Sequence, residues 1–166
     1  MDFDGYAIGG VSVGEPEEEM IRAIEHSTPW LPQDKARYAM GLGTPVQMLE
    51  MIERGVDMFD CVMPTRLARH GIAMTPDGPI HIRNERWKND MKPLDAEGHP
   101  HVTRFSRAAI RHFFRAGEML ALRLLSFQNL HFYLRLMEQA RSAIAAGQFA
   151  AFKSSFISRY QAHDIP

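Results

Sequence analysis

The sequence predicts an α/β fold that continues into a β-hairpin and a helical C-terminal segment. Before residue 64, short apolar runs alternate with helical segments, which is the pattern of parallel strands joined by crossover helices. From residue 106 onwards, apolar residues recur with the spacing of amphipathic helices. We therefore expect a βαβαβ unit over residues 1–66, a region with a hairpin over 67–105 and helices over 106–166.

The first expected strand covers residues 6–8 and runs into a glycine-rich loop over residues 9–14. Pro16 suits the first turn of a helix, and the acidic residues around it favour the positive end of the helix dipole. Pro29 and Pro32 predict the end of this helix.

The same pattern then repeats. A strand over residues 37–40 leads into glycines at 41–43, and Thr44 is a helix N-cap followed by Pro45 at the first helical position. The second helix is expected to end near Gly55.

The third expected strand, residues 56–62, carries Asp60 near its end and continues into basic residues. Because the carboxyl ends of parallel strands meet at one edge of a sheet, we expect Gly10, Gly41 and Asp60 to converge. Two interpretations of Asp60 stay open: its carboxylate acts on a phosphorylated substrate, or it caps the following turn.

Beyond residue 64, residues 72–75 and 79–82 flank an Asp-Gly turn and predict a hairpin. Trp87 lies among cations and either stacks on a base or covers the hairpin. Three helices are expected between residues 106 and 160, with boundaries near Asn129 and Gly147. Their large apolar content favours burial against further protein, as in an oligomer or with a missing partner domain.

Composition places the chain among ordinary globular proteins. Its 166 residues, 45% apolar and 23% charged, suit about one domain. The single cysteine, Cys61, excludes an internal disulfide and suits a reducing cytoplasm. No apolar run approaches the about 20 residues of a membrane helix, so we expect a cytoplasmic protein without a membrane partner or signal peptide.

The charge is divided unevenly along the chain. Residues 1–64 carry 4 Lys and Arg against 12 Asp and Glu, whereas residues 65–166 carry 15 against 8. The basic second part suggests contact with a nucleic acid, although solvated helix faces give the same balance.

The run Phe-Asp-Cys-Val-Met-Pro-Thr-Arg at residues 59–66 is the most specific motif of the chain. Tyr-Ala-Ile-Gly-Gly at 6–10 precedes it, and Arg-Ala-Gly-Glu at 115–118 and Asn-Leu-His-Phe-Tyr at 129–133 follow it. In this order the motifs resemble the C-terminal part of bacterial tRNA-guanine transglycosylases (queuine tRNA-ribosyltransferases), and the resemblance covers nearly the whole chain.

The resemblance implies a partial (β/α)8 TIM-type barrel, to which this chain contributes the last three strands, a small β-hairpin insertion and the C-terminal three-helix segment. It also implies exchange of the wobble guanine of tRNA during queuosine synthesis, through a covalent intermediate in which Asp60 is the nucleophile. The family's acid/base and purine-recognising aspartates belong to the half that this chain lacks.

The resemblance also assigns binding residues. The purine or 7-deazapurine base is expected to contact Gly9, Gly10, Val11, Glu15 and Met40. The tRNA anticodon loop is expected to contact two segments, formed by Gly41, Leu42, Gly43, Thr44, Pro45, Val46 and Gln47 and by Thr65, Arg66, Leu67, Ala68 and Arg69.

The family's zinc site is altered here. The family uses three cysteines in a C-x-C-x-x-C pattern and a later histidine, but residues 97–104 contain no cysteine and Gln128 stands at the histidine position. His99 and His101 replace two thiolates at most, and a tetrahedral site needs four ligands. We expect no cofactor and no metal ligand.

Activity is therefore expected only when a complementary half-barrel is supplied. As a protein partner we expect either that half-barrel or a second copy of the chain in a homodimer. The alternatives are a non-catalytic tRNA-binding or dimerisation subunit and an inactive truncated remnant.

Overall fold

The computed structural model describes residues 2–10, 14 and 16–162, and the chain forms two compact units, residues 1–63 and 64–166. Each unit has its own hydrophobic core. No helix in the described part of the chain combines the length and the apolar character needed to span a membrane.

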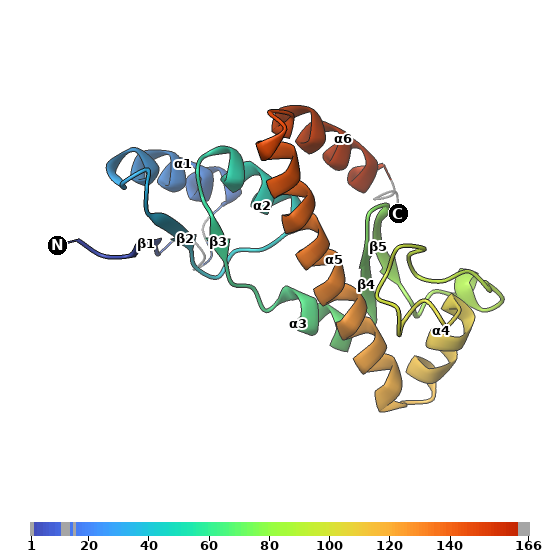
Figure 1. Ribbon diagram of the computed structural model, residues 1–166. Coiled ribbons are helices and arrows are strands. Elements are labelled where there is room, and N and C mark those ends of the chain that lie inside the picture. Colours follow the sequence, from blue (N-terminus) through green and yellow to red (C-terminus); the bar gives the residue numbers. More distant parts are fainter. Residues whose placement is uncertain (1, 11–13, 15, 163–166) are drawn as a thin grey trace. The chain divides into compact units, whose positions relative to one another are not determined.

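The first unit is built on a parallel sheet with the strand order β1-β2-β3 (Figure 1). Its elements are β1 (Gly5–Ile8), α1 (Glu17–Ser27), the 3-10 turn η1 (Thr28–Trp30), β2 (Ala36–Ala39), α2 (Pro45–Glu53) and β3 (Met58–Phe59). The predicted α/β alternation is confirmed. β3 is much shorter than the strand predicted over residues 56–62, and Asp60 follows it directly.

Local sequence explains why the helices of this unit start where they do. Three acidic residues lie in the first turn of α1. At α2, the backbone N–H of Gln47 donates to Thr44 Oγ1 at 3.3 Å, and the N–H of Thr44 donates to Gln47 Oε1 at 3.4 Å. This reciprocal capping box confirms the predicted helix start. The core joins both helices to the sheet through Ile8, Met20, Ile24, Ala39, Leu42, Met51 and Val56.

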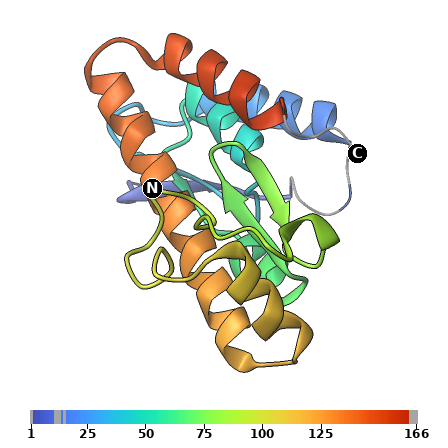
Figure 2. The same cartoon turned by 90° about the vertical axis from the view of Figure 1, so that its right-hand side faces the viewer.

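The second unit surrounds an antiparallel hairpin, in which Thr75 pairs with Gly78 across the turn. Figure 2 shows the hairpin beside α5, with α6 near its turn. The elements are α3 (Met63–Arg69), β4 (Ile72–Thr75), β5 (Gly78–His81), the 3-10 turn η2 (Glu85–Trp87), α4 (Arg107–Arg115), α5 (Met119–Ala145) and α6 (Phe149–Gln161). The predicted hairpin is confirmed, and the short helix α3 was not predicted.

The predicted helix boundary at Asn129 is wrong. Asn129 is fully buried in the middle of α5. Its Oδ1 accepts a 2.7 Å hydrogen bond from the N–H of Met74, and its Nδ2 donates to the carbonyl oxygens of Pro64 and Ile72 at 2.9 and 3.0 Å. Asparagine is tolerated inside this helix because backbone groups of the hairpin and of α3 satisfy its amide group. The break lies at Gly117 instead, whose φ is 76°.

Trp87 covers the hairpin, in agreement with the second interpretation of this residue. Its indole N–H donates to the carbonyl of His81 at 3.0 Å, and its ring packs against the core of the second unit. The guanidinium groups of Arg86 and Arg107 lie 4.3 and 4.9 Å from the ring centre. These cations occupy the ring surface that a stacked base would need.

Candidate active site

The carboxylate of Asp60 lies where the strands of the parallel sheet end. Its Oδ1 accepts a 2.7 Å hydrogen bond from the backbone N–H of Gly41, which follows β2. On the other side of β2, the N–H of Met40 donates to the carbonyl of Ile8 at the end of β1, at 3.3 Å. The three strand ends therefore meet at one edge, as predicted, and Asp60 is exposed there.

Tyr38 holds the same carboxylate oxygen. Its hydroxyl donates to Asp60 Oδ1 at 2.6 Å, although its neighbour in the β-ladder is Met58. Donation from Tyr38, and then from the N–H of Gly41, lowers the pKa of Asp60, because both bonds favour the ionised form. The same bond to Asp60 is the main reason why the pKa of Tyr38 is raised. Sequence reasoning missed Tyr38, whose only signal was a hydroxyl on the strand beside Asp60.

Replacing Tyr38 with phenylalanine is expected to raise the pKa of Asp60 towards its ordinary value, because the ionised carboxylate loses the hydrogen-bond donor that lowers its pKa most. In the native chain, ionised Asp60 contributes stability above the unfolded-state pKa of about 3.9, and this contribution is lost as the pH falls through the lower folded-state pKa. In Tyr38→Phe this contribution should be smaller, and its loss should be complete at a higher pH, because the folded-state pKa lies closer to the unfolded-state value. A carboxyl ¹³C NMR titration of Asp60 measures the shift.

The matched control for this titration is Tyr160→Phe, which removes a tyrosine hydroxyl from the second unit. The hydroxyl of Tyr160 faces Met74 Sδ at 3.9 Å, so its loss should leave the titration of Asp60 unchanged. An Asp60 pKa that is identical in Tyr38→Phe and in the native chain would show that the hydroxyl does not bind the carboxylate.

Cys61 packs next to the candidate nucleophile. Its Sγ accepts a 3.2 Å hydrogen bond from the N–H of Met63, and burial raises the pKa of its thiol. Gly43 lies so close that a β-carbon at this position would overlap both Sγ and Cβ of Cys61. Cys61 therefore fits a space that exists only because residue 43 is glycine.

The residues predicted to contact a base lie at the same edge as far as the structure describes them. Gly9 and Gly10 are exposed, and a β-carbon at Gly9 would lie 3.8 Å from Met40 Sδ. Met40 is itself 46% exposed. Val11 and Glu15 lie outside the described residues.

The first segment predicted to contact RNA divides into exposed and buried parts. Gly41 is exposed, and Thr44, Val46 and Gln47 are half-buried. The remaining residues are buried, namely Leu42, Gly43 and Pro45. Thr44 and Gln47 are also engaged in the capping box of α2, so the accessible groups of this segment are few.

The second segment predicted to contact RNA forms most of α3. Thr65, Arg66 and Arg69 are exposed, Leu67 is half-buried and Ala68 is buried in the core of the second unit. The spacing of Arg66 and Arg69 places both guanidinium groups on one side of the helix.

The residues at the family's zinc position do not fit a zinc site. The ring of His99 stacks on Phe127 with 5.1 Å between centroids, and the rings of His101 and His131 lie 5.3 and 5.8 Å away. Burial, followed by the charges of His101 and His131, lowers the pKa of His99. Within the described residues, no three His, Cys, Asp or Glu side chains are grouped so that they can hold a metal ion.

Arg135 on α5 makes polar contacts with Asp95 and Glu97, which precede His99 and His101 in the chain. Its Nη2 lies 2.6 Å from Asp95 Oδ2, and the two side chains are only 14% and 9% exposed. Its Nη1 also donates to the carbonyl of Glu97, which lies 3.2 Å from Nε2 of His131. Gln128 is fully buried and donates from Nε2 to the carbonyl of Met74 at 3.1 Å.

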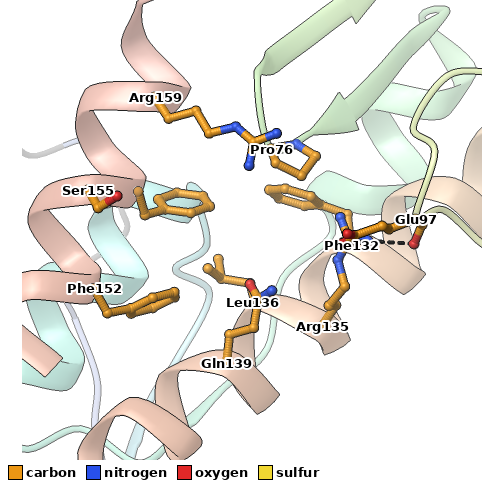
Figure 3. A pocket seen from close by; sticks show the side chains of 10 residues that line it. Pro76, Glu97, Phe132, Arg135, Leu136, Gln139, Phe152, Ser155 and Arg159 are labelled. Atoms are coloured by element: carbon orange, nitrogen blue, oxygen red, sulfur yellow. Dashed lines mark hydrogen bonds and ion pairs between the residues drawn. The ribbon is translucent and has the colours of Figure 1, made fainter. Parts of the chain in front are cut away.

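Figure 3 shows Arg135 beside a pocket of about 160 Å³ between α5 and α6. Phe132, Leu136, Phe152 and Phe156 give this pocket an apolar wall. It contains none of the residues predicted to bind the base or the RNA.

Comparison with known proteins places these features in a family context. A sequence model of the family described as "Queuine tRNA-ribosyltransferase" matches residues 1–162. The chain is 53% identical over 157 residues to the protein of that name from Thiobacillus denitrificans, covering 94% of this chain and 43% of the relative. The proteins of the same name from Fusobacterium nucleatum and Bacillus subtilis are 51% and 47% identical over 161 residues, covering 96% of this chain and 43% and 42% of the relatives. The chain spans less than half the length of these curated relatives.

Proposed function

Because the chain belongs to the queuine tRNA-ribosyltransferase family, we propose that it carries the nucleophile of a glycosyltransferase that exchanges the wobble guanine of tRNA. The observation that supports this proposal is the exposed carboxylate of Asp60, held by Tyr38 and Gly41 where the parallel strands end. A carboxylate fixed in this way splits the exchange into two displacements at the same sugar carbon.

In the first displacement, Asp60 attacks C1′ of the ribose. Tyr38 and Gly41 both bind Oδ1, so we assign the attack to Oδ2. The bond between C1′ and guanine breaks, its electron pair leaves with the base, and the base takes a proton from an acid on the complementary half. The product is an ester between Asp60 and the ribose.

In the second displacement, a purine or 7-deazapurine base attacks C1′ and loses its N–H proton to the same acid/base group. The electron pair of the ester bond returns to Asp60, and two inversions retain the configuration at C1′. The lowered pKa of Asp60 keeps the carboxylate ionised before the first step and makes it a better leaving group in the second. Gly9, Gly10 and Met40 are the described residues that we assign to the base.

We also propose that the three parallel strands are the last three of a (β/α)8 barrel. Within the described residues, β1 and β3 each pair on one side only, and their free backbone groups suit pairing with further strands. We propose that the complement carries the first half of the barrel, including the acid that protonates the leaving base. In TIM barrels, catalytic residues lie at the carboxyl ends of the strands, which is the position of Asp60.

Covalent trapping tests the proposed role of Asp60. The full chain is mixed with the first half of the Thiobacillus denitrificans relative, a tRNA that carries guanine at the wobble position, and 9-deazaguanine. We expect an adduct that survives denaturation with the native chain and no adduct with Asp60→Asn. Asp57→Asn is the matched control, because Asp57 lies before β3 and accepts a bond from the N–H of Arg37 at 2.8 Å.

Absence of an adduct with the native chain would refute the catalytic role. Retained tRNA binding in that experiment would favour a non-catalytic tRNA-binding or dimerisation subunit. Loss of both would identify the chain as an inactive remnant.

A further inference from the structure

Arg83 follows β5 and lies beside the C-terminal end of α3. The N–H of Ile82 donates to the carbonyl of Gly71 at 2.8 Å. This bond holds the residue before Arg83 against the residue that follows His70. The guanidinium of Arg83 lies 4.9 Å from the ring centre of Phe114. The same ring packs on Gly71, where a β-carbon would approach it to 2.8 Å. Phe114 therefore supports both Gly71 and Arg83.

Four exposed basic side chains lie on α3, directly after it and after β5, and we call them the α3–β5 surface: Arg66, Arg69, His70 and Arg83. The ring Nδ1 of His70 lies 2.8 Å from the carbonyl of Arg66, one helical turn earlier. This contact holds the imidazole of His70 against the last turn of α3.

The arginines of the α3–β5 surface have no acidic partner among the described residues. Glu85 is the carboxylate nearest to Arg83 in the sequence, but it pairs with Arg111 at 2.5 Å. Arg107 on the same helix as Arg111 is likewise paired, with Asp90 at 3.0 Å. The charges of Arg66, Arg69 and Arg83 are therefore available to an external anion.

We infer that Arg83 is a further RNA-contacting residue, which binds the backbone of the tRNA anticodon loop together with Arg66 and Arg69. This inference rests on the proposed function and extends the RNA-binding surface beyond α3. An aromatic ring under a guanidinium restricts its rotation, which lowers the entropy lost on binding. The planar fork of the guanidinium matches the geometry of a phosphate, and its face suits stacking on an unpaired base.

Binding of a fluorescent anticodon stem-loop RNA to the full chain tests the inference by anisotropy over a range of NaCl concentrations. Arg83→Ala is expected to weaken binding about tenfold and to reduce the slope of log K against log salt by about 0.7, the value for one lost phosphate contact on a single strand. Arg83→Lys should keep the slope but still lose affinity, because it keeps the charge and loses the planar fork.

Two comparison variants make the outcomes separable. Arg141→Ala removes an exposed arginine elsewhere in the second unit, and Arg66→Ala removes a residue assigned to RNA by the proposed function. If Arg66→Ala weakens binding and Arg83→Ala does not, the inference is wrong and the proposed function stands. Equal losses of RNA affinity in Arg83→Ala and Arg141→Ala would mean that only the net charge matters, and this result would also overturn the inference. If the native chain does not bind the RNA, the inference and the proposed RNA contact fail together.

Discussion

Replacing Arg135 with leucine is expected to destabilise the second unit by about 3 kcal/mol and to lower its melting temperature by on the order of 10 °C. Arg135 pairs with Asp95 at 2.6 Å, and both side chains are largely buried. The substitution removes the guanidinium that is hydrogen-bonded to the Asp95 carboxylate, in a place from which water is mostly excluded, and breaking a buried ion pair in this way is strongly destabilising. Calorimetry and urea denaturation measure the loss.

Arg159 provides a matched control for this prediction. It pairs with Asp77 at the same distance, 2.6 Å, but the two side chains are 61% and 53% exposed. Both arginines line the pocket in Figure 3. Arg159→Leu should therefore cost less than about 1 kcal/mol, because water screens an exposed pair. Equal losses in the two variants would mean that burial of the pair at Arg135 contributes nothing.

The melting temperature of the second unit also tests whether a metal ion stabilises it. We propose that the contacts of Arg135 and the stack of His99 on Phe127 close residues 94–105 onto α5 in place of the family's zinc. EDTA should then leave the melting temperature of the native chain unchanged, and elemental analysis should find no stoichiometric zinc. A chelator-dependent decrease comparable to that of Arg135→Leu would contradict this proposal.

The parts of the fold that could be predicted from the sequence depend on contacts between residues that are close together along the chain. The start of α2 follows from Thr44, Pro45 and Gln47, whose mutual contacts span three residues. The boundary at Asn129 failed because the partner that satisfies this side chain, Met74, lies 55 residues away. The local preference of asparagine favours a helix break. That preference gives the correct boundary only where no distant group completes the hydrogen bonds of the side chain.

The candidate site shows the same difference between local contacts, which could be predicted, and contacts between distant residues, which could not. The position of Asp60 at a strand end could be predicted from the alternation of strands and helices, and the convergence with Gly41 follows from parallel pairing. The bond from Tyr38 to Asp60 joins residues 22 positions apart and depends on the register of β2 and β3. A single sequence does not fix that register, so Tyr38 was not identified.

Replacing Gly43 with alanine is expected to destabilise the first unit by about 3 kcal/mol, at the upper end of the cost of overpacking. The added methyl group would overlap the Cβ and Sγ of Cys61. Neither side yields easily, because Gly43 precedes the capping box of α2 and Cys61 Sγ is bonded to the N–H of Met63. The clash should also separate Gly41 from Asp60, so hydrogen exchange over residues 36–61 should accelerate along with the loss in urea denaturation.

Two variants show whether the contact with Cys61 is the cause. Gly9→Ala makes the same substitution at another strand end, where the nearest atom, Met40 Sδ, lies at an ordinary 3.8 Å, and it should change stability by less than about 0.5 kcal/mol. Cys61→Gly removes the overlapping atoms, so the double variant Gly43→Ala/Cys61→Gly should be more stable than the sum of the single effects by roughly 2 kcal/mol. Additive effects would mean that Gly43 and Cys61 do not touch, and the edge that holds Asp60 would then need a different packing from the one described.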